Sequence, residues 1–268
     1  MDRKDLAAII VARLEANEPA ITVHYAQHRH FLVDDLLPAA VAHDIYRNFP
    51  DPKTMMLRSS IRERKYVTSQ MDRCPPVVEE AVYAFQDVRV VAAIQRITGL
   101  QHIEPDEMLY AGGISVMGRG HYLHPHLDNS HDMERKRYRI LNLLYYVSPD
   151  WSLDDGGNFE LWPDGVNGTP IEIQSKFNRL LVVATDRRSW HSVNRVRTDR
   201  ARTCVSNYYF SQSSPEGHEY FHVTSFRGRP EHPIRDLLLR GDAALRALAR
   251  KLSPSGVKKT EHYYKRGR

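Results

Sequence analysis

The apolar residues of this chain follow two different periods, one before and one after about residue 105. Residues 3–16 have apolar side chains at helical spacing, at Leu6, Ile9, Ile10 and Leu14. Residues 75–99 form a second, longer helical pattern, which we expect to be interrupted near Asp87 and to end at Gly99. These patterns predict that the first part of the chain is mainly helical.

Shorter elements are predicted between and after these helices. Residues 30–38 combine a short apolar run with a turn, and Pro38 can occupy the first turn of a helix that continues to Tyr46. We expect short strands within residues 55–70. Helical spacing returns in residues 232–252.

After residue 105 the pattern changes to short runs of β-branched and aromatic residues separated by Gly, Pro, Asn and Asp. These runs cover 108–118, 138–147, 158–163, 171–173, 179–185, 190–196 and 202–210. Many short, evenly spaced strands are typical of a sandwich or a double-sheet jelly roll.

We therefore expect a mainly β fold with flanking helices, in one domain over residues 1–252. Its jelly-roll core would span about residues 105–212, supported by the helical segment 1–104 and packed by a C-terminal helix at 232–252. Residues 253–268 would form a basic tail.

Composition is consistent with a cytoplasmic globular protein. The chain has 268 residues, of which 41% are hydrophobic, enough to bury a core. It has two cysteines, Cys74 and Cys204, which excludes a disulfide framework or a four-cysteine zinc site and fits a reducing compartment. No apolar stretch reaches the length of a membrane span. We expect a soluble, cytoplasmic protein.

The net charge of +5 raises the question of nucleic-acid binding. Most of this charge belongs to the tail 253–268, which has five basic residues and one glutamate. The rest of the chain is nearly neutral. Because the excess charge is not spread across the predicted fold, we expect no nucleic-acid partner.

The segment HPHLD (124–128) holds a candidate metal site. In a strand, residues i and i+2 point to the same face, so His126 and Asp128 would converge on one point. With one more histidine they would form a two-histidine, one-carboxylate triad, which leaves coordination positions open and suits non-haem Fe(II). The alternative for the isolated triplet is a solvated turn.

Two further residues strengthen the interpretation of a metal site. His191 follows the apolar strand 179–185, although a histidine there could equally be a packing residue. Arg202 begins a strand in which Arg202, Cys204, Ser206 and Tyr208 share one face. A buried arginine needs an anionic partner, and its planar fork suits a carboxylate. The alternative is an ordinary ion pair at a strand end.

Residues 105–212 resemble the Fe(II)/2-oxoglutarate-dependent oxygenases in their prolyl-hydroxylase-like branch. The resemblance rests on the order and spacing of HPHLD, YRILNLLYYV, DGGNFELW, WHSV and RTCVSNYYF. It implies that His126, Asp128 and His191 ligate iron and that Arg202 binds the distal carboxylate of 2-oxoglutarate. It also places Asn142 and Tyr146 beside that carboxylate, although Tyr146 could equally be a core residue.

The resemblance also narrows the chemistry. Halogenating relatives lack the aspartate of the triplet, which is present here as Asp128. Nucleic-acid demethylating relatives have a second arginine six residues after the clamp, where this chain has Tyr208. The implied reaction is hydroxylation of an unactivated C–H bond with release of succinate and CO2. It would use Fe(II), 2-oxoglutarate and O2, with ascorbate as an optional reductant, and no catalytic side chain beyond the metal ligands.

Several residues near the predicted site are candidates for substrate binding. Residues 187–202 contain six arginines, of which Arg188 and Arg195 could bind an anionic substrate; the alternative is a solvated hairpin edge. His131 lies in a loop near the predicted mouth, where it could contact substrate or simply be hydrated. Tyr208 shares the face of Arg202.

We therefore expect a small polar substrate, anionic or carbohydrate-like, rather than a protein. One alternative is a hydroxylase of peptidyl proline or of another protein side chain. Another, from a different class, is a non-catalytic metal- or sugar-binding jelly roll. The sequence does not indicate an oligomeric state.

Overall fold

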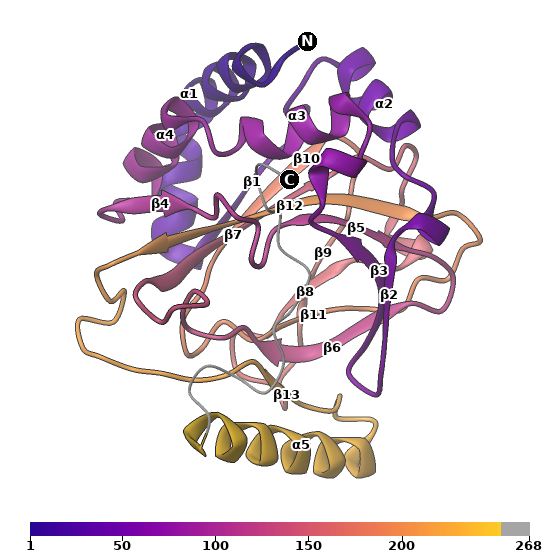
Figure 1. The fold of residues 1–268 in the computed structure, drawn as a ribbon, viewed down its shortest axis with the longest axis vertical. Helices are drawn as coiled ribbons and strands as arrows, with labels where there is room; N and C mark the ends of the chain where they lie inside the picture. The colour runs from indigo at the N-terminus through magenta and orange to yellow at the C-terminus, as the bar shows by residue number, and fades with distance from the viewer. Residues whose placement is uncertain (253–268) are drawn as a thin grey trace.

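A single curled antiparallel sheet forms the centre of the molecule (Figure 1). The computed structural model describes residues 1–252, without the side chains of residues 243 and 246–252. Within that part of the chain the strands run in the order β1-β10-β7-β12-β5-β3-β6-β11-β8-β9, with β2 beside β3, β4 beside β12 and β13 beside β6. The prediction of a mainly β, jelly-roll fold is confirmed.

The helices are α1 (Arg3–His28), α2 (Ala39–Arg47), α3 (Pro76–Ala84), α4 (Val88–Thr98) and α5 (Pro233–Leu252), with 3-10 turns η1 (Pro52–Thr54), η2 (Met71–Arg73) and η3 (Leu153–Asp155). The strands are β1 (His30–Val33), β2 (Met56–Ser59), β3 (Glu63–Thr68), β4 (Ile103–Pro105), β5 (Gly113–Met117), β6 (Tyr122–Leu127), β7 (Tyr138–Tyr146), β8 (Phe159–Leu161), β9 (Ile171–Ile173), β10 (Arg179–Ala184), β11 (His191–Val193), β12 (Arg202–Ser211) and β13 (Ser225–Phe226).

Helices α1 to α4 lie together on one side of the sheet, and α5 lies at the opposite end beside β13 (Figure 1). The largest apolar cluster fills the space between α1, α3 and α4 and the outer face of β7 and β10. A smaller cluster lies inside the curl of the sheet. The helices therefore support the outer face and leave the inner face available for a site.

Helix α1 is longer than the prediction of residues 3–16. It continues through Pro19 to His28, where Arg29 ends it with a left-handed backbone. The buried positions Leu14, Ile21 and Tyr25 continue the same stripe beyond the proline. Burial of this stripe against α3 and α4 outweighs the one backbone hydrogen bond that proline removes.

The predicted interruption near Asp87 is confirmed. Asp87 caps α4 by accepting a hydrogen bond from the backbone N–H of Arg89, and Gly99 ends that helix with a φ of +68°. The predicted C-terminal helix is α5, which buries Leu239 among apolar residues of β6 and β11. The predicted tail at 253–268 lies outside the described residues.

Strand β7 departs from simple alternation at one position. Tyr209 of β12 faces Leu141, but the next residue, Phe210, faces Arg139, so Ile140 is an extra residue in β7. Ile140 and Leu141 consequently both pack into the outer apolar cluster. Because of this β-bulge, residues of β7 before Ile140 point to the opposite side of the sheet from the one that regular alternation would give, and Arg139 points toward the inner face.

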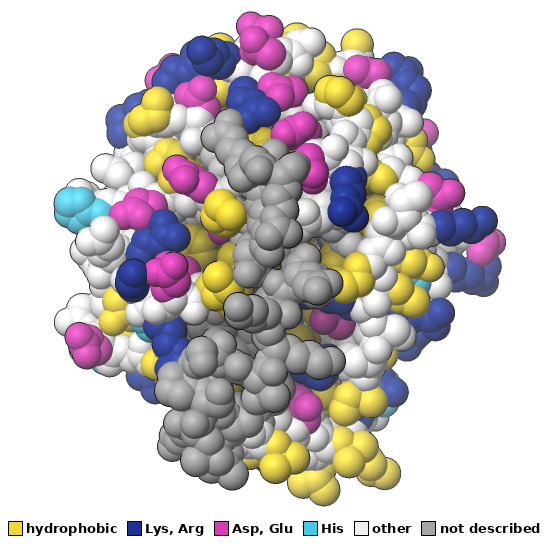
Figure 2. Space-filling view, viewed as in Figure 1, with side chains coloured by type: hydrophobic (Ala, Val, Ile, Leu, Met, Phe, Trp, Pro, Cys, Tyr) yellow, Lys and Arg dark blue, Asp and Glu magenta, His cyan; other side chains and the backbone are white. Residues whose placement is uncertain are grey.

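No helix among residues 1–252 combines the length and the apolar character needed to cross a bilayer. On the visible face of the molecule, basic and acidic side chains are interspersed (Figure 2).

Asn178 provides a test of the packing between the helices and the sheet. It is 2% exposed, and its side chain bonds the backbone N–H and carbonyl of Leu37 and the hydroxyl of Tyr145. Asn178→Gly keeps the left-handed backbone that this position requires but leaves three buried groups unpaired. We expect a loss of about 3 kcal/mol or more in the free energy of unfolding, measured by urea denaturation.

Asn178→Ala should lose about 1 kcal/mol more because alanine disfavours a positive φ. As the control, the partly exposed Asn17 bonds its own helix backbone, and Asn17→Ala should change stability by no more than about 0.5 kcal/mol. A loss at Asn178 no larger than at Asn17 would contradict this account.

A histidine cluster at the end of α1 predicts an acid-sensitive stability. The Nε2 atoms of His24 and His30 lie 3.4 Å apart, and burial lowers the pKa of both side chains from 6.5. Below about pH 6.5 these two imidazoles bind protons more readily in the unfolded chain than in the folded protein. The free energy of unfolding therefore falls as the pH drops below about 6.5. His30→Phe should flatten this decline by up to about 1.4 kcal/mol per pH unit, as measured by urea denaturation between pH 7.5 and 5. If the free energy of unfolding of the variant has the same slope against pH as that of the wild type, His30 does not contribute to the acid sensitivity.

Candidate metal centre

The pairing of β6 with β11 brings two histidines together. His126 faces His191 in register, and Asp128 follows the end of β6 directly. The Nε2 atom of His126 lies 3.7 Å from Oδ1 of Asp128, and the Nε2 atom of His191 lies 3.7 Å from Oδ2. One ligand atom from each residue lies within 4.8 Å of the other two, so these side chains could hold one metal ion.

Both imidazoles are oriented by their own backbone. Nδ1 of His126 lies 3.0 Å from the carbonyl oxygen of His124, and Nδ1 of His191 lies 2.8 Å from that of Ser189. A carbonyl at Nδ1 favours a proton on that nitrogen, which leaves the lone pair of Nε2 free to bind a metal. Burial, followed by the proximity of His191, lowers the pKa of His126 to about 3, so its ring is neutral near pH 7.

Asp128 is a buried carboxylate with a cationic neighbour. Nδ2 of Asn142 donates a 2.9 Å hydrogen bond to its Oδ2 atom, and Nη1 of Arg139 lies 3.2 Å from the same atom. Burial alone would raise the pKa of Asp128, but attraction to Arg139 and to the two histidines lowers it below its usual range. The carboxylate is therefore ionised and suited to a divalent cation.

Arg202 lies at the start of β12, deeper in the same cavity. It is 3% exposed, and its guanidinium contacts Ser175 Oγ at 3.2 Å and Met117 Sδ at 2.8 Å. No carboxylate of residues 1–252 lies within ion-pairing distance of it. Because a buried cation without an anion is costly, this arginine is suited to an anionic ligand.

The second glycine of the DGG segment makes room for Arg202. Gly157 has a φ of +64°, and a Cβ atom there would lie 3.0 Å from Cδ of Arg202 and 2.9 Å from Val196. A side chain at this position would therefore press on the stem of the arginine. This close approach explains Gly157, and Gly156 is explained by the carbonyl oxygen of Arg195, which would lie 2.1 Å from a Cβ there.

These residues line a cavity of about 620 Å³, a volume typical of small-molecule sites. Its cationic side chains outnumber its acidic ones, Glu63 and Asp128. The cationic residues are Arg58, Arg62, Lys65, Arg73, Arg139 and Arg202. Four of them come from the β2–β3 hairpin and η2, outside the motifs that suggested the site.

The hairpin cations differ in their partners. Lys65 pairs with Glu63 at 3.1 Å, and Arg62 lies 3.8 Å from Asp242 of α5. Within residues 1–252, no carboxylate lies within 4 Å of the guanidinium of Arg58 or Arg73. The cavity therefore offers positive charge that the described residues do not neutralise.

Other residues predicted for the site are placed as follows. Asn142 and Tyr208 line the cavity. Tyr146 is fully buried, and Arg202 lies over its ring at 5.0 Å. His131, Arg188 and Arg195 do not line the cavity, which leaves the expectation that they bind substrate without support.

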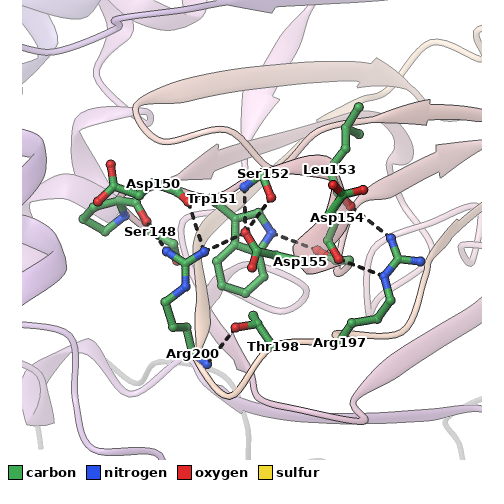
Figure 3. A network of polar contacts seen from close by, with 12 residues as sticks. Ser148, Asp150, Trp151, Ser152, Leu153, Asp154, Asp155, Arg197, Thr198 and Arg200 are labelled. Carbon is green, nitrogen blue, oxygen red and sulfur yellow. Dashed lines mark hydrogen bonds and ion pairs between the residues drawn. The ribbon is translucent and has the colours of Figure 1, made fainter.

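The surplus arginines of residues 187–202 mainly hold loops together. Arg200 bonds the carbonyls of Pro149 and Asp150 and the carboxylate of Asp155, and Arg197 bonds the carbonyls of Leu153 and Asp154 (Figure 3). Arg195 bonds the carbonyl of Gly120. These contacts show that the arginines of this segment stabilise loops, which explains the high positive charge of the segment.

Arg139 was not among the residues predicted for the site. Counting by two from Asn142 assigns Arg139 to the opposite face of β7, and the bulge at Ile140 invalidates that count. Its position in the recognised segment YRILNLLYYV was an available signal, because a charged residue inside an otherwise apolar strand needs a partner.

The donor set fits the cofactors that the sequence implied. Two imidazoles and one carboxylate suit Fe(II), and they line a cavity that leaves room for further ligands. Arg202, which has no carboxylate partner among the described residues, fits an anionic cosubstrate such as 2-oxoglutarate.

Comparison with known proteins supports the same assignment. Residues 112–210 match the model of the 2OG-Fe(II) oxygenase superfamily. No curated protein matches the chain.

Solved structures with similar folds include prolyl hydroxylases and an enzyme bound to a small molecule. A prolyl-4-hydroxylase from Pseudomonas putida is 17% identical, with a TM-score of 0.53 over 73% of this chain and 99% of its own. A prolyl 4-hydroxylase from Phytophthora capsici is 16% identical, with a TM-score of 0.56 over 91% and 80%. HygX from Streptomyces hygroscopicus, with nickel, 2-oxoglutarate and hygromycin B bound, is 12% identical, with a TM-score of 0.50 over 75% and 94%.

These structural likenesses concern the fold, whereas the family model covers β5 to β12, including both candidate histidines, Asp128 and Arg202. The segment that holds the candidate triad and Arg202 is therefore similar to the 2OG-Fe(II) oxygenase superfamily, and its side chains fit Fe(II) and 2-oxoglutarate.

Proposed function

We propose that this protein is an Fe(II)- and 2-oxoglutarate-dependent dioxygenase that hydroxylates an unactivated C–H bond of a small anionic substrate and releases succinate and CO2. The observation that carries the proposal is the cationic wall of the cavity, formed by the β2–β3 hairpin and η2 in addition to Arg202. One arginine suffices for the distal carboxylate of 2-oxoglutarate. Arg58 and Arg73 are then left to attract a second anion, the substrate.

In this proposal His126, Asp128 and His191 hold iron, and Arg202 binds the distal carboxylate of 2-oxoglutarate. The iron and the cosubstrate, with O2, supply the oxidising power for removing hydrogen from carbon. The chain contributes position: the triad fixes the metal at the end of β6, and Arg202 fixes the cosubstrate from β12. The apolar walls formed by Leu123, Leu144 and Phe159 limit access of water.

The wall of the cavity also indicates the substrate class. Arg58 is half-buried and lies near Glu63, whose pKa is lowered by Lys65 and Arg58 against the effect of burial. Glu63 therefore remains ionised and offsets part of the charge. The positive charge that Glu63 does not offset favours substrates with carboxylate or phosphate groups. A sugar acid would be both anionic and carbohydrate-like, as expected from the sequence.

A protein substrate remains the alternative within the same reaction class. The fold is shared by prolyl hydroxylases, but such a likeness at 16–17% identity concerns architecture rather than substrate. The volume and charge of the cavity support a small molecule.

Substitution of the triad tests the metal assignment. His126→Ala and Asp128→Ala should each abolish Fe(II) binding and 2-oxoglutarate-dependent formation of succinate. Arg202→Met should retain the metal and raise the KM for 2-oxoglutarate by at least tenfold, because a charge-assisted bidentate contact is lost. Metal titration and succinate quantification check both effects, and turnover without a known substrate is sufficient for the assay.

Full turnover by the Asp128→Ala enzyme would contradict the assignment. A matched control is Asp132→Ala, which removes a nearby carboxylate that pairs with Arg137 and does not line the cavity. It should leave metal binding unchanged.

Charge reversal on the hairpin tests the substrate class. Arg58→Glu should raise the KM for an anionic substrate at least tenfold, an effect of about 1.4 kcal/mol, with a smaller change in the KM for 2-oxoglutarate. Substrates are first found by testing panels of sugar acids, phosphate esters and neutral analogues for stimulated succinate formation.

The matched control is Arg188→Glu, which reverses a charge outside the cavity and should leave both constants unchanged. Stimulation by the neutral analogues alone, or an unchanged KM in Arg58→Glu, would contradict an anionic substrate.

A further inference from the structure

Arg139 is a buried cation placed beside a candidate cation site. It is 4% exposed and is turned toward the cavity by the bulge in β7. Electrostatically, a guanidinium next to a metal ligand lowers the affinity for a divalent cation, because both carry positive charge. Its presence there calls for a contribution other than charge.

The contacts of Arg139 form a chain that leads to Asp128. Nη1 lies 3.2 Å from Asp128 Oδ2, and Nη2 donates a 2.8 Å hydrogen bond to Asn129 Oδ1. The amide nitrogen of Asn129 donates in turn to the carbonyl of His131. The guanidinium also lies over the ring of Tyr208, 4.5 Å from its centre. The planar fork is therefore fixed on several sides and has one orientation toward the carboxylate.

The two oxygens of Asp128 are consequently unlike. Oδ2 accepts from Asn142, is paired with Arg139 and lies 3.7 Å from Nε2 of His191, whereas Oδ1 accepts no hydrogen bond from the groups that the structure describes. Oδ1 lies 3.7 Å from Nε2 of His126. The lone pairs of Oδ1 are therefore free on the side that faces the Nε2 lone pair of His126.

We propose that Arg139 is a positioning residue that holds Asp128 as a one-oxygen metal ligand, with Oδ2 occupied by donors and Oδ1 directed to the metal. This inference rests on the proposed metal site at His126, Asp128 and His191. Positioning and charge predict opposite effects when Arg139 is replaced, which makes the two roles separable.

The experiment measures Co(II) affinity by titration of the metal-free enzyme, followed by the visible absorption of the bound ion. Arg139→Met removes both the charge and the fork, and Arg139→Lys keeps the charge but cannot bond Asp128 and Asn129 together. If positioning dominates, both variants should bind Co(II) about 10- to 100-fold more weakly than the wild type. The absorption spectrum should also change as the carboxylate becomes free to rotate.

Tighter Co(II) binding by Arg139→Met would overturn the proposal, because it would show that Arg139 acts on the site only through its charge. Unchanged affinity in both variants would overturn it as well. Should either variant fail to fold, Asn129→Ala removes the support of Arg139 without touching Asp128. Its affinity should fall in the same direction by a smaller factor, and an unchanged value would count against the proposal.

Arg137→Met is the matched control. Arg137 is a neighbouring arginine that pairs with Glu104 and Asp132 and does not line the cavity, so its removal should leave Co(II) binding unchanged. Failure of the metal site itself has a different signature. In that case His126→Ala would bind Co(II) as well as the wild type, whatever Arg139 does.

Discussion

The cross-strand pairing of β6 with β11 is the constraint on which the rest of the site depends. It places His126 opposite His191 and leaves Asp128 at the point where β6 ends. Strand pairing fixes the distance between two side chains far more firmly than a loop does, because a shift of one residue would turn each histidine to the other face. The helices on the outer face of the sheet pack against β7 and β10 and contribute no residue to the lining of the cavity.

Burial of a carboxylate between two imidazoles carries a desolvation cost, and much of the surrounding structure offsets it. Arg139 and Asn142 supply a positive charge and a hydrogen bond from β7. Burial lowers the pKa of His126 and keeps its ring neutral, and a backbone carbonyl orients each imidazole. The same cavity leaves Arg202 without a carboxylate among residues 1–252. One end of the cavity is thus compensated from within the chain, and the other is suited to an incoming anion.

Local pattern was enough to predict the strands, the break at Asp87 and the pair His126 and Asp128, because each depends on spacing within a few positions. His191 lies far along the chain and was assigned through the family resemblance. Predictions whose outcome depends on contact with another helix or strand were less successful. The end of α1 could not be predicted from Pro19, since packing against α3 and α4 decides it. Positive charge was expected from residues 187–202, but those arginines bond loop carbonyls, and the cations of the cavity come from the β2–β3 hairpin. Composition cannot distinguish an arginine that bonds loop carbonyls from one that lines a cavity.

The single extra residue in β7 has a consequence for how this segment can vary in length. Arg139 lies before the bulge and Asn142 after it, and both face inward only because Ile140 is inserted between them. Individual residues on the outer face could be exchanged for others of similar size. Deleting one residue between them would instead turn Arg139 into the apolar layer beneath the helices, or force Asn142 out of the cavity. The strand therefore tolerates changes of side chain far better than changes of length.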